Sequence, residues 1–132
     1  MVVGATRVAE SILDTVASAP AGRRPEDDTE VQLALSDAVA IGPVDVLLEL
    51  ARRAAQARSA AGSGGPAWGI YVDRLRRSGV AHRGLSSRCS EVLDRLDADD
   101  EPGAARAAQR AYDAHGKRGL WWCAHVVADL GA

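Results

Sequence analysis

Three residues near the end of the chain have the types and spacing for acid–base or nucleophilic chemistry: Cys123, His125 and Asp129. On a helix, His125 and Asp129 lie one turn apart, so the carboxylate could fix the imidazole tautomer and favour its cation. A thiolate nucleophile needs a base and an orienting group of this kind. The pattern describes a small enzyme or ligand-binding protein with a pocket near His125. The alternative, which we favour, is a hydrogen-bonded histidine near a chain terminus.

A metal site is not predicted. Cys123 and His125 are two positions apart, and two positions along an α-helix turn a side chain through about 200°, so these two point to opposite faces. No CxxC or HxxxH spacing preorganises a zinc site, and the other potential ligands, His82, Cys89 and His115, are scattered along the chain. The sequence therefore predicts neither a bound metal nor a cofactor.

The segment from 73 to 88 is the strongest electrostatic feature, with five arginines against one acid. These arginines are Arg74, Arg76, Arg77, Arg83 and Arg88. Guanidinium groups can bind phosphates in a bidentate manner, and Ser86, Ser87 and helix-terminal amides would add donors. One alternative is therefore a phosphate- or nucleic-acid-binding subunit. Against it stand a formal net charge of −2 and the acidic clusters at 26–30 and 97–101, which could neutralise the same arginines.

Two adjacent tryptophans, Trp121 and Trp122, raise a question of packing. On a helix their side chains diverge by about 100°, and with their apolar neighbours they make the last helix apolar nearly all round. In one interpretation both rings are interior and this helix is central to the fold. In the other, Trp121, Trp122 and Val126 belong to a protein interface, with Trp122 as its anchor, because tryptophan commonly dominates binding energy.

The composition favours an all-α fold. The 132 residues include 26 alanines, five aromatic residues and no phenylalanine, so close contacts between helices must replace bulky side chains. Such a chain is long enough to bury one apolar core without disulfides. We expect residues 1–132 to form a single compact helical domain.

Apolar residues recur at helical spacing in six or seven segments separated by glycine, proline and charged stretches. We expect an irregular helical bundle with the third helix, beginning near Pro43, and the last helix, from about 117 to 130, at its centre. Gly116 fits a helix C-cap. A charged linker is predicted near 19–28 and a flexible Gly/Ser loop near 61–66. The alternation over 31–35 leaves a short strand as the minority alternative to a helix.

Cysteine usage and hydropathy bear on location. Two cysteines make no disulfide framework of the kind found in small secreted domains. Charged residues interrupt the apolar pattern of the first 16 residues, and no uncharged apolar run approaches about 18 residues. We expect a cytoplasmic protein without a membrane partner.

The functional signals resemble those of an interface, while the catalytic constellation is incomplete. We therefore favour a non-enzymatic helical interaction module or accessory subunit of a larger assembly, bound to a protein partner or to copies of itself. The phosphate- or nucleic-acid-binding subunit and the small enzyme remain the alternatives.

Overall fold

Seven helices account for nearly all residues that the computed structural model describes, which are 2–18, 29–62, 65–77 and 83–130, and no strand occurs among them. The helices are α1 (Val2–Ser18), α2 (Thr29–Ile41), α3 (Pro43–Ala60), α4 (Gly65–Arg77), α5 (Arg83–Asp97), α6 (Glu101–His115) and α7 (Lys117–Leu130). The predicted all-α bundle is confirmed. The strand alternative over 31–35 is wrong, because these residues lie within α2.

The linker and the loop predicted between helices can be compared with the structure only in part. Residues 19–28, where we expected a charged linker, lie outside the described residues. Of the predicted loop near 61–66, Ala61 and Gly62 form a turn and 63–64 lie outside the described residues, whereas Gly65 and Pro66 already begin α4. Proline is tolerated in the first helical turn, where its missing N–H has no partner in any case. The proline therefore starts a helix here rather than extending the loop.

Local residue chemistry explains several helix ends. Pro43 occupies the first turn of α3 after Gly42, whose φ of 148° suits glycine. The side chain of Asp100 caps α6 by accepting a hydrogen bond from the Gly103 amide at 3.0 Å. Gly116 ends α6 with φ 60° and donates its N–H to the Tyr112 carbonyl at 2.7 Å, as its predicted C-cap role requires.

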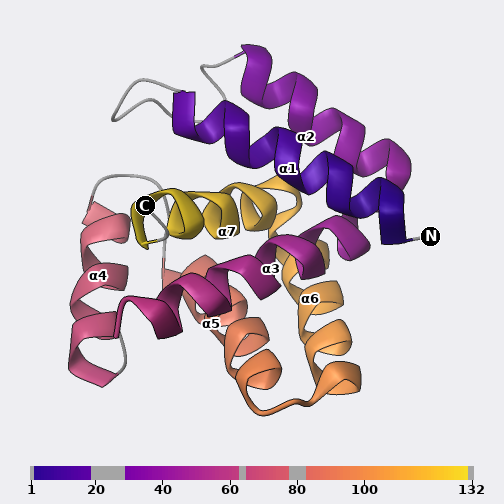
Figure 1. Cartoon of the computed structure of the whole chain (residues 1–132). Coiled ribbons are helices and arrows are strands. Elements are labelled where there is room, and N and C mark those ends of the chain that lie inside the picture. The colour runs from indigo at the N-terminus through magenta and orange to yellow at the C-terminus, as the bar shows by residue number, and fades with distance from the viewer. Residues whose placement is uncertain (1, 19–28, 63–64, 78–82, 131–132) are drawn as a thin grey trace.

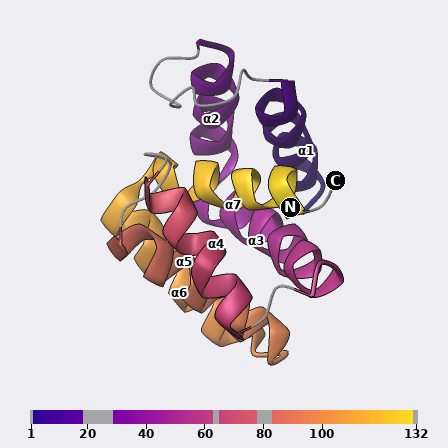
Figure 2. The ribbon, with the colours of Figure 1, turned by 90° about the vertical axis from the view of Figure 1, so that its left-hand side faces the viewer.

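The helices form layers around a central pair. Helices α3 and α7 pack together, and each also contacts α1, α2, α5 and α6. Both views place α1 and α2 on one side of this pair and α5 and α6 on the other, while α4 packs beside α5 (Figures 1 and 2). The expectation that the third and last helices are central is confirmed.

Small residues allow the close packing at the centre. Ala51, Ala54 and Ala55 of α3 are buried, and so is an alanine stripe along α6. At Gly119 of α7, an added Cβ would lie 3.7 Å from the Leu47 side chain on α3. That distance is an ordinary van der Waals contact, so Gly119 lies where the two central helices meet closely.

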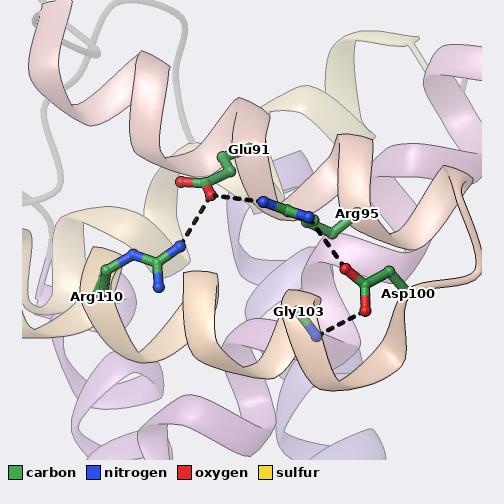
Figure 3. A network of polar contacts seen from close by, with 5 residues as sticks. All are labelled: Glu91, Arg95, Asp100, Gly103 and Arg110. Carbon is green, nitrogen blue, oxygen red and sulfur yellow. Dashed lines mark hydrogen bonds and ion pairs between the residues drawn. The ribbon is translucent and has the colours of Figure 1, made fainter.

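Ion pairs join the helices at their surfaces. Between α5 and α6, Glu91 accepts from Arg110 at 2.8 Å and lies 3.8 Å from Arg95, which in turn contacts Asp100 at 3.1 Å (Figure 3). Asp100 is also the cap of α6, through the Gly103 amide (Figure 3). This network connects the start of α6 to the middle of α5.

A second set of ties reaches α3. Arg58 is only 8% exposed and contacts Asp94 at 3.0 Å and Asp97 at 2.6 Å, both on α5. Arg52 makes a bidentate pair with Glu101 at 2.5 and 2.8 Å, and this hydrogen bonding lowers the pKa of Glu101. The acidic cluster at 97–101 therefore pairs with arginines of α3 and α5, and its described ion pairs do not include the arginines of segment 74–88.

Candidate functional site

The end of α7 carries a polar cluster in which Asp129 is the hub. Its Oδ2 lies 3.1 Å from His125 Nδ1, so the predicted pairing along the helix is present. Tyr71 of α4 donates its hydroxyl to the same oxygen at 2.9 Å. The guanidinium carbon of Arg74 lies 5.3 Å from the Tyr71 ring centroid. Tyr71 precedes Asp129 by 58 residues, so nothing in the local spacing could have indicated this partner.

The two acids of the cluster are held in opposite protonation states. Burial alone would raise the pKa of Asp129, but the hydrogen bonds from His125 and Tyr71 and the charges of His125 and Arg74 outweigh it and lower that pKa. Burial and the negative charge of Asp129 raise the pKa of Tyr71 far above its usual value. The phenol is therefore a neutral donor and the carboxylate an ionised acceptor.

Cys123, the third predicted chemical residue, belongs to a different environment. It is completely buried, and its neighbour is Cys89, also completely buried. The contact with Cys89 and burial raise the pKa of the Cys123 thiol well above its usual value. Because this thiol stays protonated and away from His125, the structure does not assemble a cysteine nucleophile with its base. Among the described residues, no group of three His, Cys, Asp or Glu side chains could hold a metal ion.

The predicted anion-binding arginines are mostly engaged by their own helix. Arg76 and Arg77 both pair with Asp73, Arg77 through Nε at 2.9 Å. Arg74 lies over Tyr71, and Arg88 is exposed on α5. The side chain of the fifth, Arg83 at the start of α5, lies outside the described residues. Three of the five arginines thus lie on α4, where each has a neighbouring partner, and two lie on α5.

A hollow of about 330 Å³ lies between α4 and α5, next to those arginines. It is lined by Trp68, Gly69, Val72, Asp73, Arg76, Ser86, Ser87 and Ser90. Neither His125 nor Asp129 lines it. This hollow is therefore not the pocket that we predicted near His125.

The predicted interface residues are buried within the chain. Trp122 and Val126 are fully buried, and Trp121 is 3% exposed. Trp122 donates its Nε1–H to Ser86 Oγ at 3.2 Å and meets the Trp68 ring edge-on at 5.9 Å. Trp121 packs against the His125 ring, and its Nε1 has no hydrogen-bond partner in the described part of the chain. The geometry therefore agrees with the interior-packing interpretation of both rings.

Exposed apolar side chains occur on α2 instead. Leu33 is 63% exposed and Ile41 is 53% exposed, and on a helix they lie about 80° apart with Asp37 midway between them. The outer face of α2, as we define it, consists of Glu30, Leu33, Asp37, Ala40 and Ile41, all exposed. The opposite face is buried against the bundle. Helix α2, rather than α7, thus carries several large apolar side chains that the bundle leaves exposed.

In the described part of the chain, no single helix is long and apolar enough to cross a membrane; α2 and α3 meet that measure only as a pair, bent by 117° at Gly42. Compared with models of protein families, with curated proteins and with solved structures, the chain matches none.

Proposed function

We propose that the protein is a non-enzymatic helical interaction module, an accessory subunit that joins a larger assembly through the outer face of α2. The observation that carries this proposal is the exposure of Leu33 and Ile41 on one side of a helix whose other side is already buried. Single exposed apolar residues are common, but neighbouring ones on one helical face are typical of a docking surface. The cytoplasmic location expected from the sequence is part of the same proposal.

The charge at the centre of this face points to a different chain as the partner. No described cation lies within ion-pair distance of Asp37, which stands between Leu33 and Ile41. Two copies paired antiparallel through this face would bring Asp37 against Asp37, which like-charge repulsion opposes. A partner helix with apolar residues around a lysine or arginine would cover Leu33 and Ile41 and neutralise Asp37.

The enzymatic alternative has less support. Its nucleophile, Cys123, is buried beside Cys89 and holds its proton, and the hollow between α4 and α5 is not lined by His125. The nucleic-acid alternative also loses support, because Arg76 and Arg77 already share Asp73 and the net charge is negative.

The test is site-specific photo-crosslinking from position 33, in cells that express the protein from its own gene. Benzoylphenylalanine replaces Leu33 in one variant and the exposed Arg106 of α6 in the control. We expect one discrete protein adduct from position 33 and none of the same mass from position 106. The adduct from position 33 should be lost in the Asp37→Lys background, because the lysine places a like charge against the partner's cation.

Two outcomes would overturn the proposal. Equal adducts from both positions, or adducts that survive Asp37→Lys, would mean that the outer face of α2 is not the docking surface. An adduct with twice the mass of the chain and only its peptides would make a second copy the occupant and remove the different partner.

A further inference from the structure

A second surface, the hollow between α4 and α5, combines features of a ligand site that the interaction proposal does not use. The two helices that line it, α4 and α5, lie away from α2 (Figures 1 and 2). Its volume of about 330 Å³ falls at the lower end of the range for small-molecule pockets, roughly 300–1,000 Å³. A ligand here would be small, about the size of one substituted ring.

The apolar part of the lining, its floor, consists of Trp68 and Val72 of α4. Trp68 stacks on Tyr71 with ring centroids 5.5 Å apart, and the guanidinium of Arg58 lies 5.0 Å from its centroid. Val72 lies one helical turn further along α4 and also lines the hollow. An added Cβ at Gly69 would meet nothing within 4 Å, so the backbone leaves open space beside Trp68. Such a floor suits an apolar or aromatic body.

The hollow is also lined by three serines of α5, which form its serine wall. Ser86 is only 3% exposed, and its oxygen accepts the Nε1–H of Trp122, so its hydroxyl acts as the acceptor in that bond and still has a hydrogen of its own to donate. The hydroxyls of Ser87 and Ser90 make no hydrogen bond to the described residues. Three donors on one wall, one of them buried and fixed by a tryptophan, suit an acceptor-rich group.

Beside these hydroxyls lies an arginine that is paired with an aspartate. Arg76 lines the hollow, and its guanidinium pairs with Asp73, which lines it too. The same carboxylate also serves Arg77, so two cations share one anion at this edge. An oxyanion bound beside Arg76 would meet a guanidinium that is only partly neutralised, and charge-assisted hydrogen bonds to it are the strong kind.

We propose that the hollow between α4 and α5 binds a small organic oxyanion, whose carboxylate or phosphate group lies against Arg76 and the serine hydroxyls and whose apolar body rests on Trp68 and Val72. Both headgroups present the same chemistry to this site, namely oxygen acceptors on a compact anion. The body distinguishes the ligand from inorganic phosphate and from nucleic acid, because the apolar floor would add nothing to the binding of an anion alone.

The experiment is a calorimetric titration of the full chain with phenyl phosphate and with benzoate, beside benzyl alcohol and inorganic phosphate as controls. We expect saturable binding of phenyl phosphate, benzoate or both, the tighter of the two identifying the headgroup. Benzyl alcohol lacks the charge and inorganic phosphate lacks the body, so both should bind at least about ten-fold more weakly. The intrinsic fluorescence should change in parallel, since Trp68 lines the site.

Matched variants separate a built site from general charge attraction. Arg76→Gln should weaken binding by about ten-fold or more, because it removes a charge-assisted contact. Arg106→Gln removes one charge at an exposed position of α6 that does not line the hollow, and it should retain near wild-type affinity. Circular dichroism checks that both variants fold.

The proposal is overturned if neither organic anion saturates below about 10 mM, if inorganic phosphate binds as well as phenyl phosphate, or if the two arginine variants lose affinity equally. These results are independent of the crosslinking at α2, since neither test uses residues of the other surface.

Discussion

At the scale of single residues, the two adjacent tryptophans are the most unusual side chains of the sequence, and their burial makes them part of the core rather than an exposed interface. Trp122 fixes the hydroxyl of Ser86 and packs against Trp68, so its contribution is to stability and to the shape of the hollow. His125 and Asp129 do meet, as their spacing predicts, but the cluster is completed by Tyr71 from a distant segment. Spacing along one helix can be read from sequence, whereas a partner on another helix depends on tertiary packing.

Truncation of Trp122 should test its interior role directly. Trp122→Ala removes a fully buried side chain and leaves a cavity, which should cost about 3–5 kcal/mol of unfolding free energy. Trp122→Phe keeps an aromatic ring but loses the donor to Ser86, and it should cost less. Urea denaturation followed by circular dichroism measures both. Ile70→Ala, at a side chain 73% exposed, is the control and should change stability by no more than about 0.5 kcal/mol. A loss below about 1 kcal/mol for Trp122→Ala would contradict the packing.

The stability contributed by Asp129 should depend on pH. Its pKa in the folded state is below the unfolded value of about 3.9, so the native state favours the ionised form. This stabilisation is fully present above about pH 4 and is lost as pH falls through the folded-state pKa. The difference in unfolding free energy between wild type and Asp129→Asn should therefore be larger at pH 7 than at pH 3. Tyr71→Phe, which removes one donor, should reduce the dependence. Equal differences in unfolding free energy at pH 7 and pH 3 would contradict the proposed pH-dependent contribution of Asp129.

At the scale of elements, helix starts and ends were predictable where a residue's own chemistry sets them. Gly116 ends α6 and Pro43 begins α3, as their types indicate. The faces of α2 and α7 could not be predicted in this way, since the sequence shows how apolar a helix is but not which neighbours cover it. Helix α7 is apolar nearly all round and lies at the centre of the bundle. Helix α2 has apolar residues on two sides, and other helices cover only one of these sides.

The start of α6 offers a sharp test of one such local determinant. At Gly103 an added Cβ would lie 2.0 Å from Asp100 Oδ2, so Gly103→Ala must displace the capping carboxylate. The variant loses the cap and the contact of Asp100 with Arg95, at a cost of about 1–2 kcal/mol. The matched control is Gly69→Ala in α4, where an added Cβ would meet nothing within 4 Å. This substitution should stabilise the helix by about 0.5–1 kcal/mol. Thermal unfolding compares them, and the same sign for both would refute the argument.

At the scale of the whole molecule, charged side chains form ion pairs that join the helices to one another. Arginines of α3 and α5 take up the acidic cluster at 97–101, and Glu91 connects α5 to α6 (Figure 3). The sequence does reveal the opposing charges of this cluster and of segment 74–88, but not which arginines the acids meet, because that depends on the order in which the helices pack. Asp37 is an exception to this internal pairing, since no described cation lies within ion-pair distance of it.

The position of Asp37 predicts how the oligomeric state responds to one substitution. Asp37→Leu would join Leu33 to Ile41 in a continuous apolar stripe and remove the repulsion between two copies, so the variant should self-associate with rising concentration. The wild-type protein should sediment as a monomer over the same range, because its central carboxylates oppose that pairing. Analytical ultracentrifugation measures both. Asp113→Leu makes the same change at an exposed position of α6 and should leave the mass unchanged. A wild-type dimer over this range, or equal self-association of Asp37→Leu and Asp113→Leu, would contradict the prediction.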